Sequence, residues 1–436
     1  MEIGFRDDNG AAKSFPVTLL LPEPTTMRSI AFLSLFLCGI TAAPSAPADI
    51  LVRSDFPGGS AKVISVDSAT QTIEIEPKTL PGRGFPCWWY MRISGLNHEQ
   101  PLTVKVRSSK QPFQGQHILG GQWAIPDQIA YSSKQGQWQQ TSPGKITAGH
   151  GTWMIPAGAD AVEAAWGPPF LQQHADMIIR DIVQSDDNCS GFELARTRGG
   201  HAVPAIRFGP DPLQQPERPC LWIQARQHAW EAGSSWVAAG LMRWLANDSP
   251  AAVRLRERTT VFVVPIMDID SVQDGCGGKG SIPRDHNRDW SAMPIYPEVA
   301  AAQKRLIDLA DREQLKVFID LHNPAPGDRR PFFFGPGIEQ LKPQEQQRYN
   351  RWLIGAVAAI DQLDPKYHFT SYISTTEEQN RVSSTWVRNH CGNDILSATL
   401  ETAWNRPQGT AEGYQQVGEQ LGEALDRFIA SPPPVR

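Results

Sequence analysis

Cysteine is scarce in this sequence. Only six cysteines occur among 436 residues, and no C-x-x-C spacing is present. Those that follow the N-terminal segment lie far apart, at Cys87, Cys189, Cys220, Cys276 and Cys391. An odd number at wide spacing indicates neither a structural zinc knuckle nor a full disulfide framework. One or two disulfide bridges remain possible if the chain is exported to an oxidising compartment.

Positive charge is limited as well. The chain carries 41 Lys and Arg against 46 Asp and Glu, a formal net charge of −5, and its basic residues form no runs. Such a surface lacks the basic footprint that neutralises phosphates, so we expect no nucleic-acid partner. The hydrophobic fraction of 40% is ordinary for a globular chain, and the length allows about two or three domains.

The N-terminal apolar run is too short to cross a bilayer, which takes about 20 residues. It extends from Ile30 to Ile40, follows the basic Arg28, and is succeeded by small residues before Asp49. This pattern is typical of a secretory signal, which we assign to residues 27–48. We therefore expect an exported protein, periplasmic or extracellular, with no permanent membrane anchor. Residues 1–26 are interpreted as an upstream extension.

Residues 49–166 contain short runs of alternating apolar and polar residues, such as AKVISV, TIEIEP, WWYMRISG and LTVKVRSS. Glycine, proline, asparagine or serine bounds each run, which predicts an all-β antiparallel sandwich domain of about eight strands. The many tryptophans and tyrosines of this region either pack in its core and edges or form a sugar-binding face. No group of catalytic residues stands out in this domain.

Residues 167–430 have a different pattern, which begins at the break formed by Pro168 and Pro169. A hairpin is predicted to turn at Gly199 and Gly200. Apolar strands then alternate with helices, with strands at 220–225, 259–267, 315–322 and 395–404 and helices at 231–247 and 297–314. The alternation predicts an α/β domain with a mixed, mostly parallel sheet and helices on both faces. Polar residues at the carboxyl ends of such strands commonly line the functional crevice.

Ionisable residues follow three of these strands. His228 and Glu231 come after the first strand, His322 ends the third, and Glu401 lies in the last. Two imidazoles and one carboxylate form the donor set of a catalytic zinc site, in which a fourth position stays open and a separate carboxylate handles protons. Singly, each residue could be a hydrogen-bonded polar group at a strand end. Together, on three strand ends of one sheet, they favour a metal site.

These residues lie in segments that resemble the zinc carboxypeptidases, and among them the branch typified by cytosolic carboxypeptidases, which has an N-terminal β-sandwich. The resemblance extends from about Phe56 to Phe428. It rests on ARQHAWEAGSSW, where the branch has H-x-x-E before a helix, on RDHNRDW, where it has D-x-N-R-x-W, and on CWWYMRISG, VVPIMDIDSV, FIDLH and TLET. The set, in this order, is specific.

The resemblance implies a zinc metallocarboxypeptidase, which removes the C-terminal residue of peptides with a free terminal carboxylate, and the signal segment predicts that it is exported. It implies that Zn²⁺ binds His228, Glu231 and His322, and that Glu401 is the general base and acid. An amide hydrolase that uses the same zinc site on a small molecule or a cell-wall stem peptide is the nearest alternative. A non-catalytic binding protein is disfavoured because all three ligands and Glu401 are present.

By the same resemblance, Asn287 and Arg288 hold the substrate's terminal carboxylate. The planar guanidinium of Arg288 suits this role because it can donate two parallel hydrogen bonds to a carboxylate, whereas a lysine cannot. Asn287 can donate one more. Without the resemblance, an exposed salt bridge is an equally good interpretation of Arg288.

Some positions depart from the family pattern. Ala229 and Trp230 stand where cytosolic carboxypeptidases usually have Pro-Gly, so we expect a bulky ring beside the metal and a differently shaped substrate. The arginine that polarises the scissile carbonyl in the family has no match at its place near Gly278. The adjacent Lys279 either takes this catalytic role or is a solvated loop lysine. For the family's active-site tyrosine, Tyr372 is a candidate.

Three further residues have two interpretations each. Asp320 lies two residues before His322 on one strand, hence on the same face, and either orients that imidazole or bonds to nearby backbone. Arg381 and Arg388 precede Glu401 in the region where the family builds its specificity pocket. They either favour an acidic terminal residue of the substrate or face solvent and pair with surface acids.

Overall fold

Short strands with alternating burial form the first region of the chain. The computed structural model describes residues 49–113, 117–134, 136–369, 373, 375–404 and 409–430. In β3 (Thr72–Glu76), Ile73 and Ile75 are fully buried and their neighbours are half-buried. β5 (Leu102–Arg107) repeats this period of two. Because successive side chains of a strand point to opposite faces, such strands give a sheet one apolar face, and these faces contribute to a continuous core.

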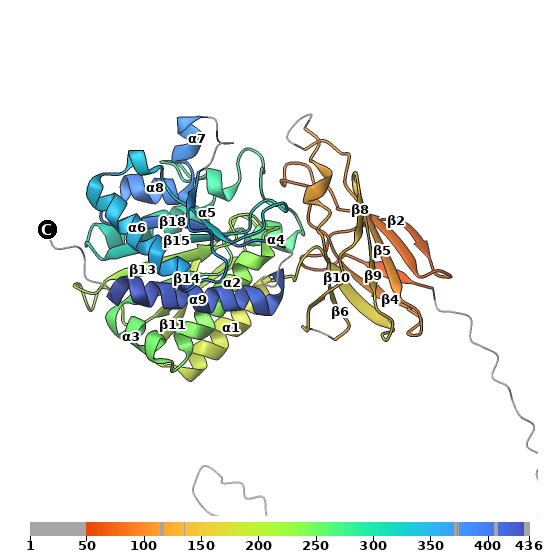
Figure 1. Cartoon of the computed structure of the whole chain (residues 1–436), viewed down its shortest axis with the longest axis horizontal. Helices are drawn as coiled ribbons and strands as arrows, with labels where there is room; N and C mark the ends of the chain where they lie inside the picture. Colours follow the sequence, from red (N-terminus) through yellow and green to blue (C-terminus); the bar gives the residue numbers. More distant parts are fainter. Residues whose placement is uncertain are drawn as a thin grey trace, which may run out of the picture. The chain divides into compact units, whose positions relative to one another are not determined.

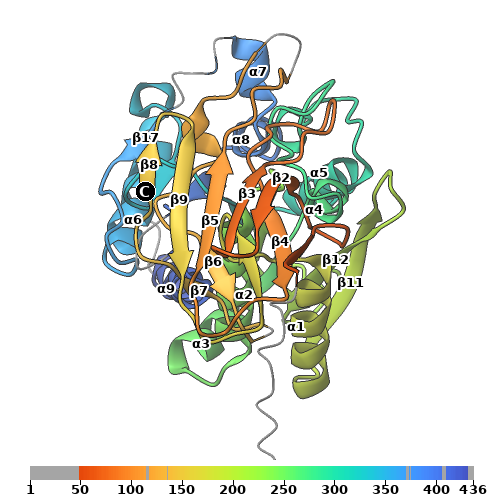
Figure 2. The same cartoon turned by 90° about the vertical axis from the view of Figure 1, so that its right-hand side faces the viewer.

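The other strands of this region are β1 (Leu51–Arg53), β2 (Lys62–Asp67), β4 (Tyr90–Ser94), β6 (Ala130–Ser132), β7 (Gln139–Gln140), β8 (Lys145–Thr147), β9 (His150–Ile155) and β10 (Ala161–Ala165), with the 3-10 helix η1 (Gly121–Trp123). They form two five-stranded sheets with the orders β1-β4-β10-β6-β7 and β2-β3-β5-β9-β8 (Figure 2). The predicted antiparallel sandwich is confirmed, and the pair β3–β5 is its parallel exception.

Several sequence predictions lie outside the described residues. They are the upstream extension at 1–26, the signal segment at 27–48 and the candidate Tyr372. The five cysteines of the described part are all buried and free, so the bridges considered from the sequence are not formed there. Among the described residues, no helix is both long and apolar enough to cross a membrane.

The second region is built on an eight-stranded sheet. Its strands are β11 (Cys189–Arg196), β12 (Ala202–Phe208), β13 (Cys220–Ala225), β14 (Thr260–Val264), β15 (Leu315–His322), β16 (Phe332–Phe334), β17 (Tyr367–His368) and β18 (Leu396–Glu401). The order is β11-β12-β14-β13-β15-β18-β16-β17, and the four central strands are parallel. β13, β14 and β18 are buried along their whole length and β15 is buried except at Lys316, as expected when helices cover both faces.

Helices lie on both sides of this sheet (Figure 1). They are α1 (Gln172–Ser185), α2 (Ala232–Ala246), α3 (Pro250–Arg258), α4 (Ile269–Gln273), α5 (Pro297–Ala310), α6 (Pro343–Val357), α7 (Thr376–Asn380), α8 (Ser383–His390) and α9 (Ala411–Ala430), with the 3-10 helices η2 (His286–Arg288) and η3 (Ile338–Gln340). The predicted mixed, mostly parallel sheet with helices is confirmed. α2 is apolar nearly all round because it packs between the sheet and α9. Gly240 permits this contact, since a Cβ there would lie 2.0 Å from the Gln415 carbonyl oxygen.

The parallel strands β13, β15 and β18 end at the same edge of the sheet. The register pairs Ala225 with Leu321, and His322 with Glu401, so the residues that follow or end these strands lie side by side. This edge holds the polar residues singled out from the sequence.

Candidate metal centre

Three strand ends bring the predicted metal ligands together. His228 lies in the loop that follows β13, and Glu231 is the residue that precedes α2. His322 is the last residue of β15, and Glu401 is the last residue of the neighbouring β18. His228 and Glu231 are three residues apart in the short loop that joins β13 to α2, so both lie at the end of the same strand.

Glu231 links the two imidazoles. Its Oε1 lies 2.8 Å from His228 Nδ1, and its Oε2 lies 2.8 Å from His322 Nδ1. The two imidazole rings are 4.9 Å apart between centroids, and one donor atom from each residue lies within 4.8 Å of the others. The three side chains are at most 2% exposed. Two nitrogens and a carboxylate therefore converge on one buried point.

The electrostatics of this cluster call for a cation. Burial alone would raise the pKa of Glu231, but the neighbouring imidazoles of His228 and His322 lower it below the ordinary value of glutamate. Burial alone would lower the pKa of His322, but Asp320 and Glu231 raise it well above its ordinary value. A carboxylate buried in this way needs adjacent positive charge, which protons on the imidazoles or a metal ion can supply. Two histidines and one glutamate are the donor set of catalytic zinc sites, so the residues fit Zn²⁺.

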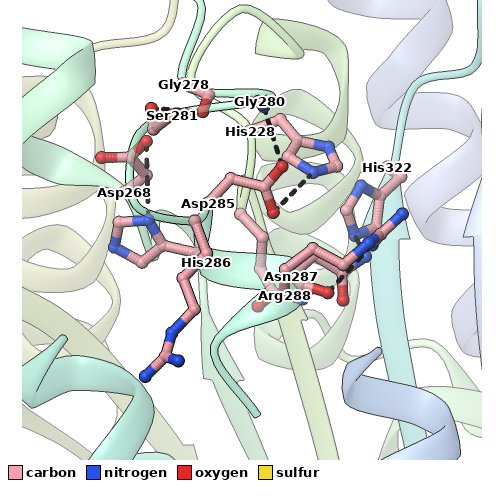
Figure 3. Close-up of polar contacts among 12 residues, drawn as sticks. His228, Asp268, Gly278, Gly280, Ser281, Asp285, His286, Asn287, Arg288 and His322 are labelled. Atoms are coloured by element: carbon pink, nitrogen blue, oxygen red, sulfur yellow. Dashed lines mark hydrogen bonds and ion pairs between the residues drawn. The ribbon is translucent and has the colours of Figure 1, made fainter. Parts of the chain in front are cut away.

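Each imidazole also has a second carboxylate on its far side. Asp320 Oδ2 lies 3.0 Å from His322 Nε2, and this oxygen also accepts hydrogen bonds from the Gln227 amide and the Ser383 hydroxyl. Of the two interpretations of Asp320, the geometry supports the one in which it orients the imidazole. Asp285 Oδ1 lies 3.6 Å from His228 Nε2 (Figure 3). Such outer carboxylates fix the ring orientation and tautomer of a ligating histidine.

Asp285 and Arg226 also belong to this site, and neither was predicted from the sequence. Asp285 is the first residue of the D-x-N-R motif, which was the available signal, but the spacing does not tell which side chain it meets. Arg226 is fully buried with φ of 64°, and its guanidinium donates to the Ala229 and Phe170 carbonyl oxygens at 2.7 and 3.2 Å. Burial lowers the pKa of Arg226 to about 9. Arg226 therefore ties the ligand loop to the chain that leads into α1.

A cavity of about 440 Å³ opens beside the metal ligands, and Glu401 lines it together with His228 and His322. The Glu401 Oε2 atom is buried and has no hydrogen-bond partner among the described residues. Burial raises the pKa of Glu401 to about 8, while His322 and Lys279 oppose the rise. A carboxyl group whose pKa lies near neutrality can take up a proton and return it.

Asn287 and Arg288 line the same cavity, in η2. Asn287 Oδ1 accepts a hydrogen bond of 3.0 Å from the Ser383 backbone nitrogen, so its Nδ2 faces the other way and lies 3.4 Å from His322 Nε2. Arg288 donates to the Asn287 carbonyl oxygen at 3.0 Å, and no carboxylate of the described chain forms an ion pair with it. Its guanidinium thus retains donors for an incoming anion.

The residue between Asp285 and Asn287 anchors this loop. His286 Nε2 lies 2.6 Å from Glu298 Oε1, and its ring stacks on Tyr296 at a centroid distance of 3.8 Å. Burial alone would lower the pKa of His286, but Asp268 and Glu298 raise it to about 9. A charged imidazole held between two carboxylates fixes the loop that presents its two neighbours to the cavity.

Lys279 also lines the cavity, so the structure brings together all seven residues predicted for the site. Its positive charge opposes the rise in the pKa of Glu401, and adds to the effect of His228 and Arg288 that lowers the pKa of Asp285. This location agrees with a role at the reacting carbonyl and differs from that of a solvated loop lysine.

Trp230 departs from the sequence expectation. Its ring is fully buried and does not line the cavity. It packs against Trp123, Trp166 and Trp404, at centroid distances of 5.5, 5.4 and 5.2 Å. The bulky ring therefore does not line the cavity, and instead joins the sandwich to the second region.

Comparisons with known proteins agree with this geometry. Residues 177–293 match the zinc carboxypeptidase family. Mouse cytosolic carboxypeptidase 4 is 25% identical over 377 residues, which cover 77% of this chain and 32% of the mouse protein. An uncharacterised protein of Zymomonas mobilis is 24% identical over 300 residues, which cover 66% of this chain and 71% of that protein. The chain thus spans about a third of the length of the mouse relative.

Solved structures share the fold. A metallo-carboxypeptidase from Burkholderia cenocepacia superposes with a TM-score of 0.72 at 20% identity, over 86% of this chain and 98% of that one. A metallo-carboxypeptidase from Pseudomonas aeruginosa, in complex with (2-guanidinoethylmercapto)succinic acid, gives a TM-score of 0.69 at 18% identity over the same shares. Residues 177–293 thus match the zinc carboxypeptidase family, and the chain is similar in sequence to the cytosolic carboxypeptidases and in fold to bacterial metallo-carboxypeptidases.

Proposed function

We propose that this protein is a zinc metallocarboxypeptidase that hydrolyses the C-terminal residue of peptides. The observation that carries the proposal is one cavity that joins three kinds of group. These are the imidazoles of the metal cluster, the Glu401 carboxyl, and the Asn287–Arg288 pair. An enzyme that cleaves only the last peptide bond needs all three within one residue's length of each other.

The chemistry follows from the groups. A Zn²⁺ ion held by His228, Glu231 and His322 would supply Lewis acidity for the attack of water on the peptide carbonyl. Glu401 takes a proton from the attacking water and returns it to the leaving amine, which its raised pKa allows. The Lys279 ammonium group stabilises the negative charge that develops on the carbonyl oxygen.

The first test concerns the free carboxylate of the substrate. Amidation of the C-terminus of a good peptide substrate is expected to lower kcat/KM by at least about 30-fold, because Arg288 loses its charged partner. Truncation of one partner of a buried, hydrogen-bonded charge pair typically costs about 2 to 5 kcal/mol, which corresponds to roughly 30-fold to several thousand-fold in binding. Arg288→Ala should cause a similar loss with the free acid, measured by steady-state kinetics.

The combination of the two changes is the sharper measurement. Because both remove the same contact, Arg288→Ala with the amidated peptide should lose little more than either change alone. Equal rates for the amide and the free acid, or cleavage at internal bonds, would replace this function with the small-amide hydrolase. An absence of hydrolysis by zinc-loaded protein across a peptide library would favour the non-catalytic alternative.

The preferred terminal residue is the subject of a second prediction. Ser397, Thr399 and Glu401 alternate along β18 and line the cavity, as does Arg388 of α8. Arg388 forms no ion pair with a described residue, whereas Arg381 pairs with the exposed Glu377 at 2.6 Å. We therefore expect peptides that end in Glu or Asp to be preferred, because Arg388 can neutralise their side chain inside the pocket.

Arg388→Ala should reduce kcat/KM for a peptide that ends in Glu by about tenfold or more, and should leave a Leu-terminated peptide nearly unchanged. Arg381→Ala is the matched control and should alter neither, since its partner lies outside the cavity. Equal kcat/KM for peptides that end in Glu, Leu and Lys would contradict the preference.

We also propose that the protein is exported. The support is the order of basic start, apolar run and small residues in 27–48. Mass spectrometry of the protein from its native cells is expected to find a mature N-terminus at Asp49 in an extracytoplasmic fraction. A protein that retains Met27 and remains in the cytosol would contradict export.

A further inference from the structure

The turn that carries Lys279 is held between two other loops. It runs through Gly277–Ser281, with positive φ at Gly278 and Gly280. On one side, the Trp230 backbone nitrogen of the ligand loop donates to the Gly277 carbonyl oxygen at 3.0 Å. Within the turn, the Ser281 hydroxyl donates to the Gly278 carbonyl oxygen at 2.6 Å (Figure 3). The turn is therefore fixed to the loop of the metal ligands.

On the other side, the turn contacts the sandwich. The Gly278 backbone nitrogen donates to the Arg83 carbonyl oxygen at 3.2 Å, and the Phe85 backbone nitrogen donates to the Lys279 carbonyl oxygen at 2.9 Å. The Arg83 side chain adds an ion pair with Asp274 at 2.6 Å. These contacts pair Arg83–Phe85 with Lys279 and the residue before it, in the manner of two short strands.

Gly84 allows the two backbones to approach. Its φ is +86°, and a Cβ at this position would lie 2.6 Å from the Lys279 carbonyl oxygen and 2.7 Å from the Gly278 carbonyl carbon. Both contacts are with backbone atoms, which cannot swing aside as a side chain can. Any other residue at this position must therefore displace the turn of Lys279.

The far end of the same turn reaches the metal cluster. The Gly280 backbone nitrogen donates to Asp285 Oδ2 at 2.8 Å, and Asp285 Oδ1 faces His228 at 3.6 Å (Figure 3). Lys279 thus has fixed neighbours before and after it, and its side chain lines the cavity with Glu401. A shift of the turn would move the Lys279 ammonium group relative to the reacting carbonyl.

We propose that Arg83–Phe85 of the sandwich is a positioning element of the active site, which holds the backbone of Lys279 so that its ammonium group stands at the scissile carbonyl. The sandwich then helps to position a catalytic group of the second region, in addition to forming its own two sheets. This inference rests on the proposed function and on the role of Lys279 within it.

The test is Gly84→Ala in the full chain. We expect kcat to fall by about tenfold or more, because a displaced oxyanion donor forfeits part of the roughly 100-fold or greater effect of such a group. KM should change little, since Arg288 is untouched, and zinc content should stay at that of the wild type. Gly82→Ala is the matched control: its φ is +73°, but its Cβ would meet only Ile282 Cβ, at 3.9 Å. This variant should retain kcat within about threefold.

The same Gly84→Ala measurement in a Lys279→Ala background separates an effect on the position of Lys279 from a general loss of protein stability. If Arg83–Phe85 acts through Lys279, Gly84→Ala should lower kcat little further once Lys279 is gone, although its effect on Tm persists. Equal losses of kcat in both backgrounds, or wild-type kcat in Gly84→Ala, would overturn the proposal. Normal kcat in Lys279→Ala would overturn it too, while the turnover of the wild type still reports on the proposed peptidase function.

A milder variant covers the case in which Gly84→Ala does not fold. Arg83→Ala removes the ion pair with Asp274 and leaves the backbone contacts of the loop in place. We expect a loss of about threefold in kcat that disappears in the Lys279→Ala background. A loss that persists in that background would contradict the positioning role.

Discussion

His322→Ala is expected to lose most of its zinc and all measurable peptidase turnover. His322 would supply one of three ligands from the end of β15, and its Nδ1 faces the same carboxylate as that of His228. A two-ligand remnant binds Zn²⁺ far more weakly than a three-ligand site. The variant also removes the imidazole that faces Asp320 and leaves Glu231 with that of His228 alone, and both carboxylates are buried, which is costly.

The zinc content per chain is measured directly by inductively coupled plasma mass spectrometry after dialysis. The wild type should carry about one zinc per chain. His201→Ala is a suitable control, because His201 lies at the hairpin of β11 and β12 and is absent from the cavity lining. This control should keep both zinc and turnover.

Thermal unfolding separates loss of metal from loss of fold. Binding to the native state alone stabilises a protein by about 4 kcal/mol at a ligand concentration a thousand times Kd, which raises Tm by several degrees. Zinc should therefore raise the Tm of the metal-free wild type, and should leave the Tm of His322→Ala unchanged. Full zinc occupancy with normal turnover in the variant would remove His322 from the metal site.

The cluster could be predicted from the sequence because buried parallel strands have a pattern that can be recognised in short stretches of the chain. Apolar runs that alternate with helices predict a central sheet, and parallel strands present their carboxyl ends at one edge. His228, His322 and Glu401 each follow or end such a run, so their proximity needed no knowledge of loop structure. The observed pairing of His322 with Glu401 in the register of β15 and β18 is the direct outcome.

The same reasoning could not predict the direction in which a loop side chain points. A residue in the loop between a strand and a helix can point toward the cavity or toward the core, and the spacing does not decide which. Trp230 was expected beside the metal, yet its ring packs against the tryptophans at positions 123 and 166 of the sandwich region. Those partners lie 107 and 64 residues earlier in the sequence, so no local pattern encodes the contact.

Contacts between loops could not be predicted from the sequence either. Asp285 reaches His228 because its loop is fixed by His286, which in turn needs Glu298 and Asp268 from α5 and the start of α4. Gly84 could be recognised as a turn residue, but its significance depends on the Lys279 carbonyl oxygen, which lies far along the chain. The reactive groups were thus predictable, and the groups that hold them were not.

Glu401→Gln is expected to lower kcat by about 100-fold or more while zinc content and fold are retained. The substitution preserves the shape of the side chain but replaces a proton acceptor with an amide, and a positioned acid-base group typically contributes about 10² to 10⁴ in rate. Glu401 is 8% exposed, and its Oε2 has no partner among the described residues, so the change breaks few contacts that support the fold. Glu345→Gln is the matched control, because Glu345 is also buried but lies outside the cavity.

The pH dependence gives an independent reading of the same group. Burial raises the pKa of Glu401 to about 8, and a cation bound at the adjacent ligands would lower it, so that the base form is available near neutrality. As pH rises through the pKa that Glu401 has in the zinc-loaded enzyme, Glu401 loses its proton. The kcat/KM of the wild type should therefore increase. Glutamine does not titrate, so the residual activity of Glu401→Gln should lack this acid limb. A zinc-loaded variant with near-normal kcat, or with the acid limb intact, would show that another group moves the proton.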